Sequence, residues 1–263
     1  MNHPPRFVDL HCHLLPGLDD GATDWEQSLA MARMAAADGT SIVIATPHQL
    51  GNYGQNRGET VRNRCAQLQE LLDRHGVQLQ ILPGADVRIE PEMIAKLESG
   101  EVLTLADRHR HVLLELPHEV YLPLERLLDR LKAAGLTGVL SHPERNQGIL
   151  ARPRLVEPLV AAGCLMQVTA GSLTGTFGSQ AKRLAQSLVE QQLVHFIATD
   201  AHGAKSRRPL LRSAFDCVSQ LVGHETAVDL CCRNPAAVAA GKSVDIKPRK
   251  SASTGWFPWK KVA

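Results

Sequence analysis

The chain has 263 residues, of which 44% are hydrophobic and 21% charged, and its formal net charge is +2 at pH 7. This composition is typical of a soluble globular protein, and the length suits either two small domains or one α/β barrel. The small net charge gives no indication of a nucleic-acid partner. Residues 1–6 lack a signal-peptide core and no apolar run approaches the roughly 18 residues of a membrane span, so we expect a cytoplasmic protein.

The first predicted strand carries two histidines on one face. Apolar and polar residues alternate over 7–13 (FVDLHCH), the period of a strand, so His11 and His13 point to the same side. Neutral imidazole is a common ligand for a catalytic metal. Two histidines alone are equally compatible with one core residue and one surface residue, so the later strands must decide between these interpretations.

Apolar runs and amphipathic segments alternate along the rest of the chain. We predict strands over 41–47, 77–82, 112–116, 137–142, 165–169 and 194–199, and a brief extended piece over 101–105. We predict helices over 25–37, 62–75, 91–97, 122–134, 152–162, 179–192, 210–222 and 225–232. This alternation specifies parallel strands with crossover helices. About seven such units favour a single barrel domain over 1–242; an open doubly wound sheet is the alternative, although no glycine-rich phosphate loop follows a strand.

The last stretch, 243–263 (SVDIKPRKSASTGWFPWKKVA), differs from the barrel in composition. It is basic and contains Trp256, Phe257 and Trp259 close together. We interpret it as a C-terminal tail that is either mobile or docked, as a strap across the barrel or as an anchor that makes peripheral contact with a membrane surface.

Histidines and carboxylates follow the predicted strands one after another. They are His11, His13, His48, Asp86, Glu115, His142, Asp200 and His202. In a parallel barrel the carboxyl ends of the strands form one rim, where active sites are assembled, so we expect these side chains to meet there. Imidazole and carboxylate ligands without thiolate suit Mn, Fe or Zn. The set is too large for one ion and predicts a cluster of two or three metals.

The sequence motifs resemble those of a known family. They are Val8-Asp-Leu-His11-Cys-His13, Asp19-Asp20-Gly21, Ala45-Thr-Pro-His48, Pro83-Gly-Ala-Asp86-Val-Arg88, Leu114-Glu115-Leu-Pro117, Ser141-His142-Pro-Glu-Arg145, Ala170-Gly-Ser-Leu173 and Thr199-Asp200-Ala-His202. In order and spacing they are similar to the PHP (polymerase and histidinol phosphatase) superfamily. Within it they resemble the bacterial tyrosine-protein phosphatases of capsular and exopolysaccharide gene clusters, over residues 7 to 240.

The resemblance implies a distorted (β/α)7 barrel with a trinuclear centre, usually of manganese, for which Fe, Zn or Mg are conceivable substitutes. By position, the first metal takes His11, His13, Asp86 and Asp200; the second takes Asp86, Glu115 and His142; the third takes Asp20, His48 and His202. The bridging residue is usually glutamate in this family, whereas here it is Asp86. Because aspartate is one methylene shorter, either the backbone approaches the metals or the bridge is weaker.

The resemblance also implies two arginines that hold phosphate. Arg145 matches the first. For the second, Arg207 keeps the expected distance from His202, whereas Arg208 keeps the expected neighbouring proline, and the sequence leaves both open. Guanidinium groups bind phosphate through two hydrogen bonds and stabilise charge on its oxygens.

Four other polar residues receive structural interpretations. We expect Asp9 to support a ligand or a strand end, Asp19 to form a turn beside Asp20, and Ser172 and Thr174 to belong to a glycine-rich loop rather than to act as nucleophiles.

The predicted activity is hydrolysis of protein phosphotyrosine by in-line attack of a metal-activated hydroxide, without a covalent phosphoenzyme. No cysteine is followed by arginine at the CxxxxxR spacing, which argues against a cysteine-based tyrosine phosphatase. The implied substrate is a bacterial tyrosine autokinase of polysaccharide export. The alternatives are a small-molecule phosphatase, such as one for histidinol phosphate, and a non-catalytic metal-binding interaction module.

Overall fold

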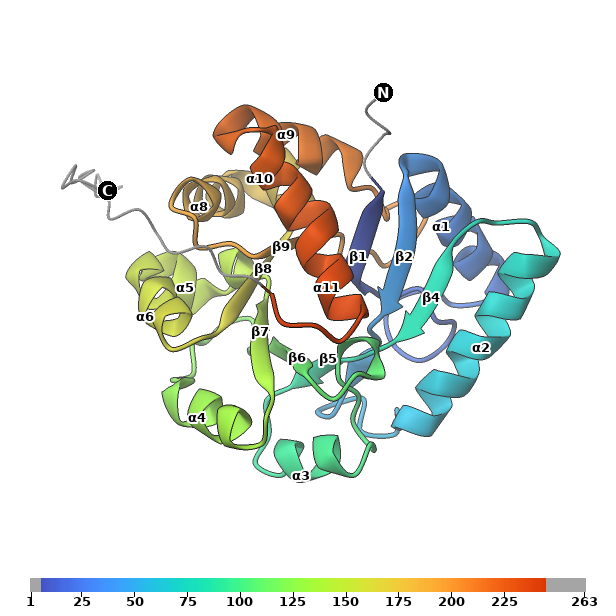
Figure 1. Cartoon of the computed structure of the whole chain (residues 1–263), viewed down its shortest axis with the longest axis horizontal. Helices are drawn as coiled ribbons and strands as arrows, with labels where there is room; N and C mark the ends of the chain where they lie inside the picture. The colour runs from blue at the N-terminus through green and yellow to red at the C-terminus, as the bar shows by residue number, and fades with distance from the viewer. Residues whose placement is uncertain (1–5, 245–263) are drawn as a thin grey trace.

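The computed structural model describes residues 6–244, in which all the strands are parallel (Figure 1). The strands are β1 (Phe7–Cys12), β2 (Thr40–Ala45), β3 (His48–Gln49), β4 (Gln80–Pro83), β5 (Asp86–Arg88), β6 (His111–Glu115), β7 (Thr137–Ser141), β8 (Leu165–Thr169) and β9 (Phe196–Ala198). They form two sheets, ordered β1-β2-β4 and β3-β5-β6-β7-β8-β9. The predicted tail lies almost wholly outside the described residues.

The two sheets are parts of one distorted barrel. The chain passes from β2 to β3 through Thr46 and Pro47, and from β4 to β5 through Gly84 and Ala85, so each pair is one interrupted strand. The ring closes beyond β9, where the His13 N–H donates to Ala201 O at 2.8 Å and the Asp200 N–H donates to His11 O at 2.8 Å. This closure confirms the predicted barrel and excludes the open sheet.

Helices cover the outside of the barrel. They are α1 (Trp25–Asp38), α2 (Gly58–Arg74), α3 (Met93–Glu98), α4 (Glu125–Ala133), α5 (Gln147–Ala151), α6 (Val156–Ala161), α7 (Ala170–Thr174), α8 (Gly178–Glu190), α9 (Arg212–Val222), α10 (His224–Val228) and α11 (Asn234–Ala239). The start and end of α1 follow from its sequence, because Asp24 accepts the N–H of Gln27 at 2.8 Å and Gly39 ends the helix at φ 105°. No helix among the described residues is long and apolar enough to cross a membrane.

Three sequence predictions differ from the structure. Residues 101–105 form no strand, because the Leu103 N–H is already bound by the side-chain oxygen of Gln49 at 2.7 Å. The predicted loop around Ser172 and Thr174 is the short helix α7. The predicted helix 225–232 is α10 followed by a π-helical turn, η4 (Asp229–Arg233), after which the chain continues into α11, where Pro235 has no N–H for a helical hydrogen bond.

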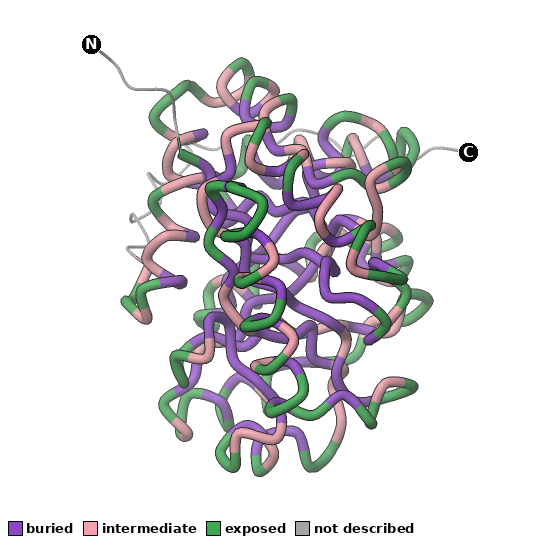
Figure 2. The backbone as a smooth tube through the Cα atoms, turned by 90° about the vertical axis from the view of Figure 1, so that its right-hand side faces the viewer, coloured by how far each residue is buried: buried purple, intermediate pink, exposed green. Residues whose placement is uncertain are grey.

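One end of the barrel is closed by α11. This helix crosses in front of the strands in Figure 1, and its Val238 and Ala239 pack in one apolar cluster with Val8 and Leu10 of β1. The buried segments run through the centre of the molecule and the exposed ones surround them (Figure 2). Since Val8 and Leu10 lie before the last residues of β1, the plug occupies the amino end of the barrel and leaves the carboxyl rim for polar side chains.

Candidate metal centre

The carboxyl rim brings together all nine residues that the sequence proposes as metal ligands. They form four overlapping groups whose ligand atoms lie within 4.8 Å of one another: His13, Asp20, His48 and His202; His11, His142 and Asp200; His11, His13 and Asp86; and His48, Asp86 and Glu115. The parallel strands explain this convergence, because ligands at or just after the carboxyl ends of β1, β6, β7 and β9 share one edge with His48 and Asp86, which begin β3 and β5 just beyond the ends of β2 and β4.

The deepest part of the cluster lies between the two histidines of β1 and two aspartates. The Nε2 atoms of His11 and His13 are 3.1 Å apart. Oδ1 of Asp200 lies 3.3 Å from Nε2 of His11 and 3.5 Å from Nε2 of His13. Oδ2 of Asp86 lies 3.5 Å from Nε2 of His11. All four side chains are buried, so these atoms converge on a site that water hardly reaches.

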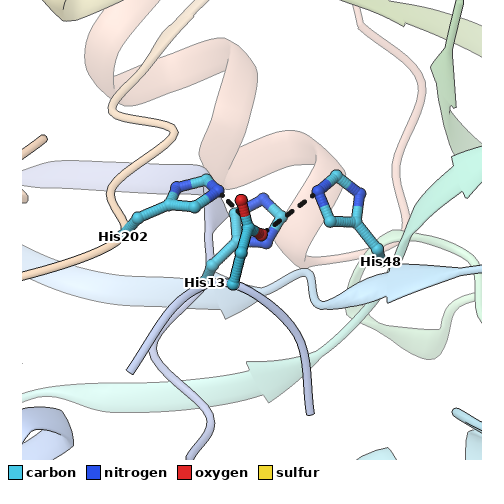
Figure 3. Close-up of side chains that lie close together, drawn as sticks. His13, His48 and His202 are labelled. Carbon is cyan, nitrogen blue, oxygen red and sulfur yellow. Dashed lines mark ion pairs between the residues drawn. The ribbon is translucent and has the colours of Figure 1, made fainter. Parts of the chain in front are cut away.

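A second group lies nearer the surface. The rings of His13, His48 and His202 lie close together (Figure 3), and those of His13 and His202 are 4.0 Å apart between centroids. Oδ1 of Asp20 lies 3.3 Å from Nε2 of His202 and 3.6 Å from Nε2 of His48. Asp20 reaches this position from the loop after β1. It is the one residue of the nine that was predicted as a ligand from the family resemblance and not from its position at a strand.

The electrostatics of the cluster fit a bound cation. Both carboxylate oxygens of Asp86 are buried without a hydrogen-bond donor, an arrangement that is costly for an anion unless a positive charge lies beside it. Burial and the charge of Asp86 raise the pKa of Glu115 to about 8. Burial lowers the pKa of His11, but Asp200 and Asp86 outweigh burial and raise it to about 9. A metal ion held by these groups would replace that proton and stabilise the ionised carboxylates.

Two other histidines are held in the neutral form that ligates metals. Burial lowers the pKa of His13 to about 4. Burial and the charge of Arg145 lower the pKa of His142 to about 3. Imidazole binds a metal only when it is deprotonated, so these rings are available as ligands at neutral pH.

Hydrogen bonds behind the cluster fix which ring nitrogen faces it. Nδ1 of His13 lies 2.7 Å from Oδ2 of Asp19, and Nδ1 of His11 lies 2.8 Å from Oε1 of Gln167. With Nδ1 donating, each Nε2 keeps its lone pair for a metal. Asp19 does form the expected turn, through the N–H of Gly21 at 3.0 Å, but its contact with His13 was not predicted from the sequence. Gln167 was not predicted either, and its only signal is a polar residue inside an apolar strand.

The backbone at the rim is strained at three site residues. His142, Asp200 and Arg207 have φ values of 33°, 50° and 45°, in the left-handed region that non-glycine residues rarely adopt. Asp9 supports one of them as expected: its Oδ1 accepts the N–H of Thr199 at 3.0 Å, and its Oδ2 accepts the Thr199 hydroxyl. The end of β9 is therefore fixed from behind, which turns Asp200 inward.

A cavity of about 250 Å³ opens over the cluster, and Arg145 and Arg207 line it together with His118. Both guanidinium groups contact Oδ2 of Asp200, that of Arg207 at 2.6 Å. Arg208 is exposed and does not line the cavity, so the structure places only Arg207 beside the site. A larger groove of about 1180 Å³ lies over α1, α2, β2 and β4, and its described lining residues include no cluster of metal-binding side chains.

Comparison with known proteins agrees with this geometry. Residues 7–240 match the family described as "Capsular polysaccharide synthesis, CpsB/CapC". The chain belongs to the CpsB/CapC family. It is 38% identical over 221 residues to the tyrosine-protein phosphatase YwqE of Bacillus subtilis, covering 83% of this chain and 86% of YwqE. It is 27% identical over 238 residues to the tyrosine-protein phosphatase CpsB of Streptococcus pneumoniae, covering 88% of this chain and 98% of CpsB.

Solved structures place this CpsB/CapC chain in the same fold. A structure described under "Crystal structures of YwqE from Bacillus subtilis and CpsB from Streptococcus pneumoniae, unique metal-dependent tyrosine phosphatases" superimposes with a TM-score of 0.88 at 36% identity, over 92% of this chain and 97% of that chain. The lactonase Lmo2620 from Listeria monocytogenes reaches a TM-score of 0.56 at 14% identity, over 92% and 95%, and shares the fold alone. The family resemblance inferred from the motifs is thus confirmed.

Proposed function

We propose that this chain is a metal-dependent tyrosine-protein phosphatase of capsular polysaccharide synthesis that hydrolyses phosphotyrosine without a covalent phosphoenzyme. The observation that carries this proposal is the convergence of nine histidines and carboxylates beneath a cavity lined by two arginines. The identity to YwqE and CpsB, both tyrosine-protein phosphatases, supports the same activity here. No described cysteine is in a disulfide, and no residue among those lining the cavity is a cysteine nucleophile.

We assign the metal ligands as a working set of three sites. The first comprises His11, His13, Asp86 and Asp200; the second Asp86, Glu115 and His142; the third Asp20, His48 and His202. Manganese is the proposed ion, and Fe, Zn or Mg are the alternatives with compatible ligand preferences. Such ions lower the pKa of a water and neutralise phosphoryl oxygens. The unpartnered oxygens of Asp86 support its place between two of the sites.

The two arginines then bind the substrate phosphate. Each guanidinium offers donors in a planar fork that matches two phosphate oxygens and stabilises the charge that develops there. In the structure both groups meet Oδ2 of Asp200, which shows that they reach the same point at the edge of the metal cluster. If Asp200 held a metal, its charge would be shared with that ion, and the guanidinium groups of Arg145 and Arg207 would be available to the phosphate.

The substrate we propose is a phosphotyrosine protein, specifically a bacterial tyrosine autokinase of polysaccharide export. A cavity of about 250 Å³ accommodates a phosphorylated side chain and not a folded surface, which suits a phosphotyrosine in an exposed, extended segment. The involvement of the family in capsular polysaccharide synthesis is consistent with such a partner.

Three substrates test this proposal. With Mn²⁺ added, the protein should release phosphate from p-nitrophenyl phosphate and from a phosphotyrosine peptide, and EDTA should abolish both reactions. Histidinol phosphate should be turned over much more slowly; a preference for it would favour the small-molecule alternative. No metal-dependent hydrolysis of any of the three would leave only a non-catalytic metal-binding module.

Two neighbouring arginines provide a matched pair for the phosphate site. Arg207→Lys removes the planar fork and should raise KM for the peptide about tenfold or more, since a bidentate contact is lost. Arg208→Lys makes the same change on an exposed side chain and should leave KM unchanged. Equal effects of the two substitutions would contradict the assignment of Arg207.

A further inference from the structure

One aromatic ring lies beneath both arginines of the cavity. Cζ of Arg145 is 4.1 Å from the centroid of the Phe177 ring, and Cζ of Arg207 is 5.8 Å from it. We propose that Phe177 is a positioning residue that holds both guanidinium groups where the substrate phosphate binds. This inference rests on the proposed phosphatase function and names the element that arranges its phosphate site.

The chain around Phe177 is built to fix the ring. Gly175 and Gly178, at φ values of 97° and 88°, turn the backbone on either side of it. Gly171 of α7 lies against the ring, since a Cβ at Gly171 would be 2.9 Å from Cε2 of Phe177. The ring therefore packs on the backbone of α7, and a side chain at Gly171 would displace it.

The helix that carries this contact is tied to the segment of Arg145. Glu144, the residue before Arg145, is fully buried, and its Oε1 accepts the Ser172 hydroxyl at 2.7 Å and the Thr169 N–H at 3.0 Å. Ser172 belongs to α7. These hydrogen bonds of Glu144 connect the 3-10 turn η2 (Pro143–Arg145), which carries Arg145, to α7, against which the Phe177 ring packs.

The shared ring offsets the repulsion between the two guanidinium groups. Two guanidinium groups that approach one point repel each other, and each arginine carries substantial rotamer freedom. In the structure Oδ2 of Asp200 contacts both, but its single negative charge balances only one of them, and the proposed function assigns Asp200 to a metal. The π face of Phe177 attracts both cations without competing for metal and without occupying the donors that phosphate needs. Preorganised in this way, the arginines lose less entropy when they bind phosphate.

Two other roles for Phe177 make different predictions. If its ring only filled space, its replacement by leucine would lower stability and leave phosphate affinity unchanged. If its ring stacked on the substrate phenol, the replacement would raise KM for phosphotyrosine and leave binding of inorganic phosphate unchanged. Inorganic phosphate, which has no ring, therefore separates positioning of the arginines from both alternatives.

The experiment measures the binding of inorganic phosphate to the manganese-loaded protein by calorimetry, with thermal unfolding recorded for each variant. Phe177→Leu should weaken phosphate binding about tenfold, which lies between the values of an exposed and a desolvated cation–π contact, and Phe177→Tyr should restore it. Phe215→Leu is the matched control, because Phe215 also lies near an arginine, with Cζ of Arg212 at 5.9 Å from its ring centroid, but Arg212 does not line the cavity. Its phosphate affinity should equal that of the wild type.

A double-mutant cycle with Arg145→Gln tests whether Phe177 acts through the arginine. In that background Phe177→Leu should weaken phosphate binding by less than about threefold, because the nearer cation is gone. A full tenfold effect in that background, wild-type affinity in Phe177→Leu, or no phosphate binding by the wild type would each overturn the inference. Phosphate binding needs no turnover, so failure of the wild type to hydrolyse phosphotyrosine would refute the proposed function separately.

Discussion

Replacement of Asp19 by asparagine is the most informative perturbation of the metal centre, since Asp19 supports the site from behind. Its Oδ2 lies 2.7 Å from Nδ1 of His13 and accepts the N–H of His48 at 3.0 Å, while its Oδ1 accepts the N–H of Gly21 at 3.0 Å. Burial raises the pKa of Asp19, but the charge and hydrogen bond of His13 outweigh burial and hold it below its usual range. The carboxylate is therefore ionised at neutral pH and orients two of the proposed ligands.

The size of the effect follows from what asparagine can still do. It has the shape of aspartate and can accept from only one oxygen, so it cannot serve His13, His48 and Gly21 together. Loss of the partner that orients a metal-binding histidine typically lowers metal affinity 10–100-fold, which corresponds to about 1.4–2.7 kcal/mol. We expect Asp19→Asn to weaken Mn²⁺ binding by this factor without unfolding the barrel.

Calorimetric titration of the apoprotein with Mn²⁺ measures this change. Asp24→Asn is the matched control: Asp24 also accepts a backbone N–H, from Gln27 at 2.8 Å, but it caps α1 at the surface, and asparagine caps equally well. Wild-type Mn²⁺ affinity in Asp19→Asn, or the same loss of affinity in both variants, would refute the role of Asp19 in orienting the ligands.

Three further predictions follow from single residues. Asp86→Asn should abolish most of the rise in Tm that Mn²⁺ gives the wild type, because the neutral amide no longer needs a cation, and an undiminished rise would contradict its role. Gly21→Ala should destabilise the fold by about 3 kcal/mol in urea unfolding, since its Cβ would lie 2.1 Å from the carbonyl oxygen of His13; near-wild-type stability would show that the loop can move. Burial lowers the pKa of His195 to about 4, so the unfolded chain takes up this proton at a higher pH than the folded chain. The free energy of unfolding should therefore fall by up to about 3 kcal/mol as the pH drops from about 6.5 to 4. In His195→Gln this part of the pH dependence should vanish, and its persistence would show that another group causes it.

The ligands that lie at or after the strands were the part of the site that could be predicted from the sequence. A period of two places His11 and His13 on one face, and parallel strands bring their carboxyl ends to one rim, so Asp86, Glu115 and the later ligands follow from order alone. Asp20 does not follow from periodicity. It reaches the cluster because the loop after β1 folds back through the Ala22 N–H to His13 O at 3.1 Å, a tertiary hydrogen bond without a local pattern.

The contacts between side chains from distant elements could not be predicted in this way. The sequence leaves Arg207 and Arg208 both open, because Arg207 keeps the expected spacing and Arg208 the neighbouring proline, and only the folded structure shows that Arg207 lines the cavity and contacts Asp200. Gln167 lies in a strand that was predicted and Phe177 lies just before a predicted helix, but the residues they contact are far along the chain. Local propensity indicates where such residues lie in the fold and leaves their partners undetermined.

The central claim is that these histidines and carboxylates hold a cluster of metal ions. Anomalous diffraction at the manganese edge, from crystals grown with Mn²⁺, tests it most directly. We predict peaks between His11, His13 and Asp200, and on both sides of Asp86. If these side chains were well ordered in the crystal and the map showed no anomalous density among them, the metal centre and the phosphatase mechanism built on it would be contradicted.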